Sequence, residues 1–501
     1  MFRILKPITT LSMESNNIIE IIKKLNIRNI AITAQSAKPN QIFFALPGIS
    51  RHGNDFIDIA LANGASLIIT DQEPITSYSN VIVVKNIILV IKDVVNYLYP
   101  KFPKYLVAVT GTDGKTSVVN YFQQLCMLAG EQAASIGTLG VITTNNHLNK
   151  LLNQNKIKPE CATTMSYIQT RYVLHQLATN GINFVALEAS SHGLDQNRLM
   201  DIKFQAAAFT SFSRDHLDYH KTMNKYLDAK LKLFKENVVS NGIAIVNNNI
   251  NELSIIQSKI TDEFGLKLLS VEQQGDIQII DVQSSLNGQK VHFRYRNSDY
   301  KFEVPVIGRV HITNILIALL LAVNVGFDSA KLIPLLSNLK PIKGRMEKIQ
   351  FGNCYAFVDY ALTPNALATM LTELRTLNNK GRLITIFGGS ENRDAIARRV
   401  QMGIVASKLS DLVIVTDQDS GNEDPAAIRK EILQVAPSAV EIPNRGEAIK
   451  YAISIMVDND ILLIAGKGHE TRQVLKGRII NYNDMEQVKL HLKQLNKMSN
   501  Q

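Results

Sequence analysis

An α/β fold built on parallel sheets is predicted by two patterns in this chain. Short apolar runs alternate with helical patterns through the middle and the last third of the sequence. The runs are 184–187, 206–210, 243–246, 383–387, 412–415 and 461–464. In addition, a β-branched run at 107–110 stops at a glycine-rich loop, and an apolar-periodic segment follows at 118–128. Continuous apolar strands separated by helices are typical of parallel sheets covered by helices on both faces.

The length of 501 residues predicts about three domains. We expect boundaries that give domains at 1–103, 104–340 and 341–501. The Lys-Phe-Pro-Lys sequence at 101–104 is a plausible linker, and the third block begins around Pro341. Strands of the third block end at Gly or Asp loops, as in doubly wound sheets that bind ligands at the carboxyl ends of their strands.

The composition is that of an ordinary globular protein, with 46% hydrophobic and 20% charged residues. The segment Met1–Asn26 lacks the apolar core of a signal peptide, and the longest apolar run, 315–323, is too short to span a bilayer. Three cysteines lie far apart and suggest buried thiols in a cytoplasmic protein: Cys126, Cys161 and Cys354.

The net charge of +10 raises the question of nucleic-acid binding. Lys and Arg residues are scattered, however, and no dense basic run or aromatic-interleaved stripe occurs. A basic balance also suits a protein whose substrates are polyanions such as ATP. We therefore expect no nucleic-acid partner and no stable membrane insertion.

The most informative motif is Gly-Thr-Asp-Gly-Lys-Thr-Ser at 111–117, between a predicted strand and a predicted helix. Its glycines would expose backbone N–H groups, and the helix N-terminus adds partial positive charge for phosphate binding. Lys115 would reach the terminal phosphates, and the Thr116 hydroxyl would bind Mg²⁺. The spacing departs from the common phosphate loop, because Val109 stands where its first glycine belongs.

Four further segments follow or adjoin strand ends and are predicted to share one active site. They are 188–198, 213–220, 226–234 and 465–470. Each also has a plainer interpretation. Glu188 would be a helix cap, His216 and His220 surface residues paired with neighbouring aspartates, Lys230 and Lys232 a solvated helix face, and Gly466 and Gly468 parts of a turn.

Taken together, these motifs resemble the Mur ligase family. The likeness rests on 111–117, on Ser-Ser-His-Gly-Leu at 190–194 and on Arg-Asp-His-Leu-Asp-Tyr-His at 214–220. It covers nearly the whole chain, is strongest over 107–234 and 466–470, and is weak in the first 40 residues. The resemblance implies three domains: an N-terminal UDP-substrate domain, a central P-loop parallel sheet for ATP and Mg²⁺, and a C-terminal Rossmann-like domain for the amino acid.

The resemblance also implies a reaction. ATP phosphorylates a carboxylate of a UDP-linked peptide, and the amine of an amino acid then displaces phosphate from the acyl phosphate. In the most similar branch, the third amino acid is added to UDP-N-acetylmuramoyl-L-alanyl-D-glutamate during peptidoglycan precursor synthesis. The expected partners are therefore this UDP-linked dipeptide, ATP and a free amino acid. We expect the protein to be a monomer.

Roles for individual residues follow from the same resemblance. The catalytic residues would be Lys115, Lys230 and His216. ATP would contact Gly111, Thr112, Asp113, Gly114, Lys115, Thr116, Ser117, Asn314, Arg345 and Asp359. Magnesium would be held by Thr116, Glu188, His216 and Lys230, the last modified to a carbamate. The UDP-linked substrate would contact Thr163, Thr164, Ser190, Gln196 and Arg198. The amino acid would contact Arg393, Asp419, Gly466 and Glu470, with Glu470 pairing with its amine.

Several positions depart from the family pattern, mainly on the ATP and amino-acid sides. The differences include 33–37, Met165, His311, Leu362, Asn365 and 388–392. The most consequential is Gln-Asp-Ser-Gly at 418–421, where enzymes that add meso-diaminopimelate carry Asp-Asn-Pro-Arg. Gly421 cannot grip a distal carboxylate as that arginine does. Lysine-adding members also lack the arginine, so its absence weakens the assignment of meso-diaminopimelate without settling it. We keep meso-diaminopimelate as the first expectation and L-lysine as the alternative.

The sequence is also compatible in part with two other functions. A folate-polyglutamylating ligase would keep the fold, but the segments 190–198 and 214–220 argue against it. A non-catalytic nucleotide-binding relative is supported by Leu362 and Gly421. The intact ATP and metal positions favour an active enzyme.

Overall fold

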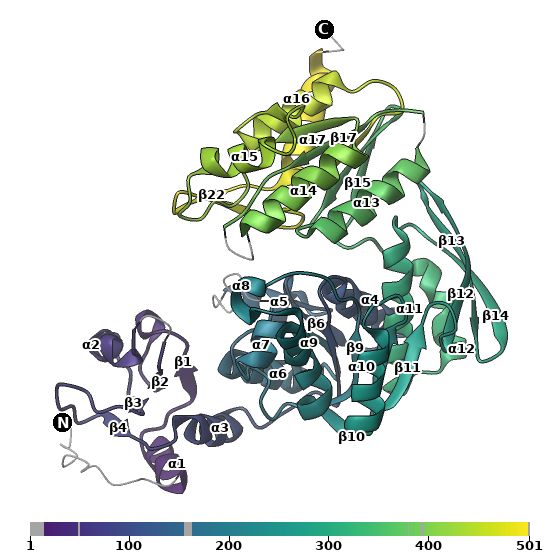
Figure 1. The fold of residues 1–501 in the computed structure, drawn as a ribbon. Coiled ribbons are helices and arrows are strands. Elements are labelled where there is room, and N and C mark those ends of the chain that lie inside the picture. Colours follow the sequence, from purple (N-terminus) through teal and green to yellow (C-terminus); the bar gives the residue numbers. More distant parts are fainter. Residues whose placement is uncertain (1–14, 49–50, 155–162, 379, 392–394, 499–501) are drawn as a thin grey trace. The chain divides into compact units, whose positions relative to one another are not determined.

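The computed structural model describes residues 15–48, 51–154, 163–378, 380–391 and 395–498 (Figure 1). The chain packs as two compact units. The first is formed by Met1–Lys104 and Met165–Asn183, and the second by Tyr105–Thr164 and Phe184–Gln501. Cys161 and Arg393 lie outside the described residues.

The first unit contains a four-stranded parallel sheet in the order β1-β2-β3-β4. Its strands are β1 (Asn29–Ala31), β2 (Gln41–Ala45), β3 (Leu67–Thr70) and β4 (Val81–Val83), and its helices are α1 (Ser15–Lys24), α2 (Ile57–Ala62), α3 (Ile87–Leu98) and α6 (Tyr167–Thr179). Apolar residues of β2 and β3, such as Ile42 and Ile68, are fully buried. The interior of this unit is therefore formed by short apolar strands.

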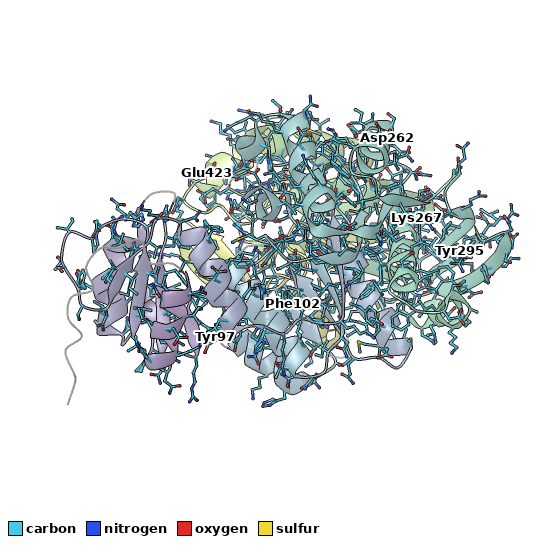
Figure 2. All side chains as sticks on the ribbon, turned by 90° about the horizontal axis from the view of Figure 1, so that it is seen from below. Tyr97, Phe102, Asp262, Lys267, Tyr295 and Glu423 are labelled. Atoms are coloured by element: carbon cyan, nitrogen blue, oxygen red, sulfur yellow. The ribbon has the colours of Figure 1, made fainter. Side chains whose placement is uncertain are left out.

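Arg171 attaches α6 to the first unit, although this helix comes much later in the sequence. Its side chain is 1% exposed. The guanidinium donates hydrogen bonds to Asn96 Oδ1 at 2.7 Å and to the carbonyl of Tyr99 at 3.1 Å, and it lies 4.3 Å from the ring centroid of Phe102. Figure 2 labels Phe102 and Tyr97 on this unit. A buried charge needs such partners, and here they fix α6 against the end of α3.

The second unit is built around a ten-stranded sheet in the order β14-β13-β12-β11-β10-β9-β5-β8-β6-β7. The strands are β5 (Tyr105–Thr110), β6 (Ala133–Gly137), β7 (Gly140–Thr143), β8 (Phe184–Glu188), β9 (Phe204–Phe209), β10 (Val238–Asn247), β11 (Lys267–Val271), β12 (Ile277–Ser285), β13 (Gly288–Tyr295) and β14 (Ser298–Val304). The helices are α4 (Lys115–Leu128), α5 (Asn146–Gln154), α7 (Ser191–Asp195), α8 (Leu217–His220), α9 (Met223–Lys232), α10 (Leu253–Ser258), α11 (Arg309–Asn324) and α12 (Ser329–Leu332).

The middle of this sheet is parallel, as predicted. Strand β5 pairs with β8 on one side and β9 on the other, both in parallel register. Both ends of the sheet are antiparallel, through β6–β7 and through the long hairpins of β12, β13 and β14 (Figure 1). In β13, buried and more exposed residues alternate, and Val291, Phe293 and Tyr295 are among the buried ones. Such a strand has no continuous apolar run in its sequence.

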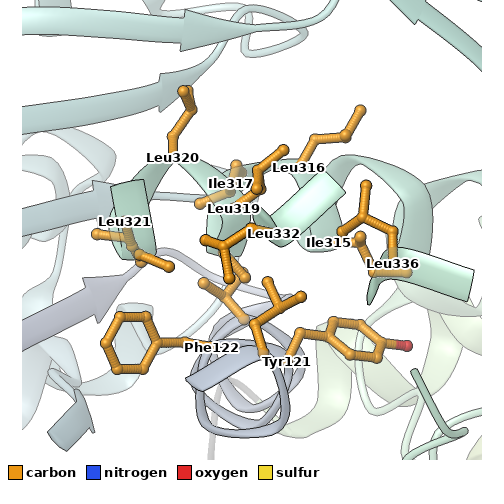
Figure 3. Packing of buried hydrophobic residues seen from close by; sticks show 14 of the residues in the cluster. Tyr121, Phe122, Ile315, Leu316, Ile317, Leu319, Leu320, Leu321, Leu332 and Leu336 are labelled. Carbon is orange, nitrogen blue, oxygen red and sulfur yellow. The ribbon is translucent and has the colours of Figure 1, made fainter. Parts of the chain in front are cut away.

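Helices α4 and α11 pack together over one face of this sheet. Tyr121 and Phe122 of α4 belong to the same apolar cluster as a run of buried residues in α11, of which Leu316 and Leu320 point away from α4 (Figure 3). The helix contains the continuous apolar run 315–323, and 12 of its residues are buried, as expected of a helix enclosed on most sides. This packing fixes the phosphate-loop helix against the helix that carries Asn314.

A six-stranded sheet in the order β15-β16-β20-β17-β18-β19 forms the C-terminal part. Its elements are β15 (Glu347–Phe351), β16 (Cys354–Asp359), α13 (Pro364–Leu377), β17 (Leu383–Phe387), α14 (Ala395–Leu409), β18 (Leu412–Val415), α15 (Pro425–Leu433), β19 (Val440–Glu441), α16 (Arg445–Ile455), β20 (Ile461–Ala465) and α17 (Asp484–Met498), with a separate hairpin of β21 (Arg472–Leu475) and β22 (Arg478–Asn481). Residues of α13, α14 and α15 belong to one apolar cluster and residues of α16 and α17 to another. The sheet is therefore covered on both faces, as predicted for a Rossmann-like domain.

The structure bears on two expectations from the sequence, one about the cysteines and one about the length of the apolar helices. Cys126 and Cys354 are buried free thiols, as expected. Among the described residues, no helix has both the length and the apolar character that crossing a bilayer requires. The proposed domain boundaries at 103 and 340 stay a prediction.

We predict that Leu320→Ala destabilises the chain by about 2 to 5 kcal/mol, because it opens a cavity between α11 and its neighbours. Far-UV circular dichroism during urea unfolding measures this, since the chain has no tryptophan. Ile255→Ala is the control, because Ile255 on α10 is 51% exposed and the change should stay within about 0.5 kcal/mol. Equal losses in both variants would contradict the assigned core.

Candidate active site

The phosphate loop connects β5 to α4 through two glycines with positive φ angles, Gly111 at +141° and Gly114 at +88°. A Cβ atom on Gly111 would lie 2.1 Å from Thr210 Oγ1, and one on Gly114 would lie 2.8 Å from Asn314 Oδ1. Both the backbone conformation and the close approach therefore require glycine. The loop is held between the end of β9 and helix α11.

Two lysines converge on this loop. Lys115 Nζ donates to the carbonyls of Gly111 and Thr112, both at 2.8 Å, and Lys230 Nζ donates to the same Gly111 carbonyl at 2.7 Å. Lys230 is 1% exposed. Burial, together with the nearby Lys115 charge, holds the pKa of Lys230 well below its usual value. The shift is in the direction of the neutral, nucleophilic amine.

One cavity of about 680 Å³ contains most of the predicted ATP and metal positions. All four predicted magnesium ligands line it: Thr116, Glu188, His216 and Lys230. The predicted ATP contacts that line it are Thr112, Asp113, Gly114, Lys115, Thr116, Ser117, Asn314, Arg345 and Asp359. Gly111 is not a lining residue, and its carbonyl instead accepts the lysine hydrogen bonds. The structure thus brings together groups from β8, β9, α4, α9, α11 and β16.

Glu188 places a buried carboxylate beside the phosphate loop. Its oxygens accept hydrogen bonds from the Thr138 amide at 2.8 Å and the Thr138 hydroxyl at 3.1 Å. Burial raises its pKa, while Lys115, Arg345 and the hydrogen bonds to the carboxylate oppose the shift. A Cβ on Gly137 would lie 2.1 Å from Glu188 Oε1, so this close approach requires glycine.

The predicted magnesium ligands fit a magnesium ion only in part. The Glu188 carboxylate and the Thr116 hydroxyl are hard oxygen ligands of the kind that Mg²⁺ prefers. Within the described part of the chain, however, no three His, Cys, Asp or Glu residues come together as a ligand set. A magnesium ion here would take its remaining ligands from phosphate oxygens, water or a modified Lys230.

Arg345 and Asp359 reach the cavity from the start of the C-terminal part. Arg345 Nη2 donates to Thr116 Oγ1 at 3.1 Å, and the guanidinium carbon lies 4.5 Å from the Tyr360 ring centroid. Asp359 ends β16, accepts the Met346 amide at 2.7 Å, and has a pKa raised by burial. The Arg345 cation is therefore placed within hydrogen-bonding distance of the Thr116 hydroxyl.

The predicted contacts to the UDP-linked substrate separate into two groups. Thr163 and Ser190 line the cavity. Thr164 instead bridges backbone groups, donating to the Glu188 carbonyl at 2.8 Å and accepting the Ser190 amide at 2.9 Å. Arg198 donates to the carbonyl of Thr164 at 2.7 Å and to the side chain of Gln196 at 2.6 Å. These three residues adjoin the cavity but do not line it.

The predicted amino-acid contacts form a separate cluster in the C-terminal part. Lys467 is fully buried and pairs with Asp419 at 2.8 Å and Glu470 at 2.7 Å. Gly466 has φ of +105°, and its carbonyl accepts the side-chain amide of Gln418 at 3.1 Å. Arg393 lies outside the described residues. Asp419 and Glu470 are thus held in place by a shared lysine.

The structure decides most of the plainer interpretations. Glu188 is the last residue of β8 and not a helix cap. His220 is only 5% exposed and is therefore not a surface residue. His216 has a left-handed backbone and lies 3.3 Å from Asp215, so it does pair with a neighbouring aspartate. On α9, Lys230 is buried but Lys232 is partly exposed and pairs with Asp195.

Sequence reasoning gave no role to several cavity residues, although Tyr226 begins the segment 226–234 that was expected in the active site. The Tyr226 hydroxyl lies 3.2 Å from Thr112 Oγ1, and its ring centroid is 4.3 Å from Lys230 Nζ. Its position four residues before Lys230 was an available signal, because such pairs share a helix face. Thr138 and Glu272 offered no comparable signal, since only the strand order brings them to the cavity.

His311 has a close partner on the phosphate-loop helix. Its Nδ1 lies 2.9 Å from the Tyr121 hydroxyl, and both side chains are buried. Burial lowers the pKa of His311 to about 4, and the Arg345 charge acts in the same direction. The imidazole is therefore neutral at neutral pH.

Comparison with known proteins identifies the family. The Mur ligase middle domain matches residues 109–322, the Mur ligase glutamate ligase domain matches 344–468, and the family's catalytic domain matches 26–110. A UDP-N-acetylmuramoyl-L-alanyl-D-glutamate–2,6-diaminopimelate ligase from Rickettsia conorii is 43% identical over 478 residues, which cover 95% of this chain and 98% of that relative. The chain belongs to the Mur ligase family.

Solved structures of Mur ligases are similar throughout. A structure titled as a UDP-N-acetylmuramoyl-L-alanyl-D-glutamate–2,6-diaminopimelate ligase matches with a TM-score of 0.62 at 28% identity, covering 94% of this chain and 95% of that one. The MurF ligase from Thermotoga maritima in complex with ADP matches with a TM-score of 0.66 at 17% identity, covering 95% and 99%. At that identity, the second likeness concerns the fold alone.

The low pKa of His311 predicts a pH effect on stability. Between pH 6.5 and about 4, the unfolded chain binds a proton at His311 that the folded chain does not, so stability falls as the pH falls. Relative to His311→Asn, the unsubstituted chain should lose roughly 3 kcal/mol between pH 7 and pH 4. Urea unfolding of both proteins at the two pH values measures this, and equal losses would contradict a buried neutral imidazole.

Proposed function

We propose that this Mur ligase adds meso-diaminopimelate to UDP-N-acetylmuramoyl-L-alanyl-D-glutamate with ATP, as the names of its relatives state for those proteins. The observation that carries the proposal is the single cavity that contains the phosphate loop, Glu188 and Lys230. A kinase-like step and an acyl transfer both need phosphate, carboxylate and cations in one place. The identity of 43% over almost the full length supports the substrate.

The proposed reaction has two steps. A carboxylate oxygen of the dipeptide attacks the γ-phosphorus of ATP, which forms an acyl phosphate and releases ADP. The amine of the incoming amino acid then attacks the acyl carbon, loses a proton and expels phosphate. Lys115 and Arg345 would offset the charge on the phosphoryl group, because two anions must approach each other in the first step.

Lys230 is proposed to act as a carbamate. Its neutral amine would attack carbon dioxide, forming an N–C bond and releasing one proton. The modification replaces an amine, which is a cation when protonated, with an anion beside Glu188 and Thr116, so the lining would attract Mg²⁺. The burial of Lys230 and its lowered pKa support this chemistry. Bound magnesium would help to neutralise the phosphates during transfer.

The incoming amino acid is proposed to bind near Asp419, Gly466 and Glu470. Gly421 has φ of +55°, and a Cβ there would lie 1.3 Å from Glu391 Oε2. Glu391 thus fills the space where a side chain at 421 would begin. Because a carboxylate stands here in place of a guanidinium, L-lysine is kept as a second acceptor beside meso-diaminopimelate.

The cytoplasm is the proposed compartment. The described cysteines, Cys126 and Cys354, form no disulfide, as is usual in a reducing environment. The substrates are ATP, a UDP-linked dipeptide and a free amino acid. We propose that the chain acts as a monomer without nucleic acid.

We predict that the full-length protein releases phosphate from ATP only when the UDP-linked dipeptide and an accepted amino acid are both present. Mass spectrometry of reactions with a panel of amino acids should detect the tripeptide product with meso-diaminopimelate. Product with glutamate and a folate, or no product with any substrate pair, would refute the proposal. A larger yield with L-lysine would reassign the acceptor.

We predict that Lys230→Ala reduces ligation by at least about 100-fold, and that a short-chain carboxylate such as acetate or propionate restores part of the rate. The added carboxylate would take the place of the missing carbamate. Lys232→Ala is the matched control, because it changes a partly exposed lysine of the same helix and should retain activity. Full activity of Lys230→Ala without added carboxylate would contradict the assigned role.

A further inference from the structure

Three loops meet at the carboxyl edge of the C-terminal sheet, where β17 lies between β20 and β18 in parallel register. The loop after β17 carries Glu391, the loop after β18 carries Asp419 and Gly421, and the loop after β20 carries Glu470. Doubly wound sheets bind their ligands outside this edge. The proposed function places the incoming amino acid here but assigns it no contact with Glu391.

Glu391 is fixed over the loop after β18 by two hydrogen bonds. Its amide donates to the Asp419 carbonyl at 2.8 Å, and its Oε2 accepts the amide of Asn422 at 3.2 Å. A Cβ on Gly421 would lie 1.3 Å from the same oxygen. The Glu391 carboxylate therefore occupies the volume in which a side chain at 421 would begin. Two departures from the family pattern, at 388–392 and at 418–421, thus meet in space.

Carboxylates are in excess at this edge. Lys467 is buried and pairs with both Asp419 and Glu470, which leaves one negative charge uncompensated. Within the described part of the chain, no cation pairs with Glu391 and no donor reaches its Oε1. The other acids of these loops are paired with cations from elsewhere: Asp417 with Arg429, Glu423 with Arg399 and Asp424 with Lys476. The excess of about two negative charges favours a cationic ligand.

A buried amide beside these carboxylates also has an unused acceptor. Gln418 is 3% exposed, and its Nε2 donates to the Gly466 carbonyl at 3.1 Å. Its Oε1 has no hydrogen-bond partner among the described residues. A Cβ on Gly466 would lie 2.5 Å from this oxygen, so Oε1 points at a glycine that is a predicted contact of the amino acid. Because buried polar atoms are normally paired, this oxygen indicates a ligand that donates hydrogen bonds.

The distance between the loops determines which ligands can contact both. Strands β20 and β18 flank β17, so they lie about 10 Å apart. An acceptor whose amine pairs with Glu470 reaches the carboxylate beside Gly421 only through a long side chain. The side chain of Lys467 covers a similar gap, since its ammonium joins Glu470 to Asp419. A chain of lysine length with a cationic end therefore fits this edge.

We propose that Glu391 is a specificity-determining residue for the acceptor, and that its carboxylate binds a terminal ammonium group of the incoming amino acid. The chain then selects acceptors by a distal cation and not by a distal carboxylate. Both meso-diaminopimelate and L-lysine carry such an ammonium group. This inference rests on the proposed function, and it assigns the recognition to a residue from the loop after β17.

The first test measures kcat/KM of ligation for L-lysine and for L-norleucine, which lacks the terminal ammonium. Glu391→Gln keeps the volume and the oxygen that accepts the Asn422 amide, but it removes the charge. It should lower kcat/KM for L-lysine about 5- to 20-fold, because a charge-assisted hydrogen bond is lost. The value for L-norleucine should change by less than about 2-fold. Equal losses for both amino acids, or no loss for either, would overturn the proposal.

Asp424→Asn is the matched control. Asp424 lies three residues after Gly421, its side chain is 55% exposed, and it pairs with Lys476 at 3.2 Å. Removing this charge should leave the ratio of L-lysine to L-norleucine within about 2-fold, since an exposed pair contributes little. Melting curves by circular dichroism check that each variant folds. A change of the ratio equal to that in Glu391→Gln would mean a general effect of charge and would overturn the direct contact.

The second test reverses the charge and looks for a gain. Glu391→Lys places an ammonium group where the carboxylate lies, so it should favour L-2-aminoadipate, whose side chain ends in a carboxylate. The ratio of kcat/KM for L-2-aminoadipate to that for L-lysine should rise at least about 10-fold over the unsubstituted chain. A loss of packing lowers both values together and leaves the ratio unchanged, and that result would refute the proposal.

Direct binding separates the inference from the proposed function. Saturation-transfer NMR measures binding of L-lysine and L-norleucine to the full chain and to Glu391→Gln. A preference for L-lysine that depends on Glu391, in a chain that forms no ligation product, would support the inference and refute the proposed reaction. Ligation with the same preference in both proteins would do the reverse. A chain that neither ligates nor binds L-lysine would refute both.

Discussion

Two lysine side chains converge on one backbone carbonyl of the phosphate loop. Lys115 and Lys230 both donate to the Gly111 oxygen, from helices that start 108 residues apart in the chain. Two like charges are stable so close together only if one of them gives up its proton or gains a counter-charge. The burial of Lys230 favours its neutral form. The same arrangement prepares the site for polyanions, because a triphosphate would supply the missing negative charge.

The cavity concentrates polar groups that a structure optimised for stability alone would avoid. Glu188, Lys230 and His311 are all buried, and in each the shift in pKa is due mainly to burial. Such groups cost folding free energy because water no longer solvates them. The apolar contact between α4 and α11 offsets this cost in the same part of the chain. Perturbed groups gathered in one cavity are typical of active sites.

In the C-terminal part, a buried lysine likewise fixes the positions of the groups around it. Lys467 is fully buried between Asp419 and Glu470, so two carboxylates from different loops are held at fixed positions. The loop that ends at Gly421 is held further by the amide of Gly477, which donates to the Gly421 carbonyl at 2.7 Å. The Glu391 carboxylate occupies the space beside Gly421. The departure from the family pattern at 418–421 is therefore part of a well-packed arrangement and not a local loss of structure.

The sequence by itself determined the elements and the motifs. The runs at 383–387 and 412–415 are the strands observed, and the Gly-rich loop lies between β5 and α4 as predicted, because apolar periodicity and glycine conformation are local properties. Only the tertiary structure decided that Lys230 is buried while Lys232 is partly exposed, that Gln196 and Arg198 stand outside the cavity lining, and that Tyr121 meets His311. These facts follow from the order of the strands and the packing of α4 on α11, which brings together Tyr121 and His311 although they are 190 positions apart. No local pattern specifies such contacts.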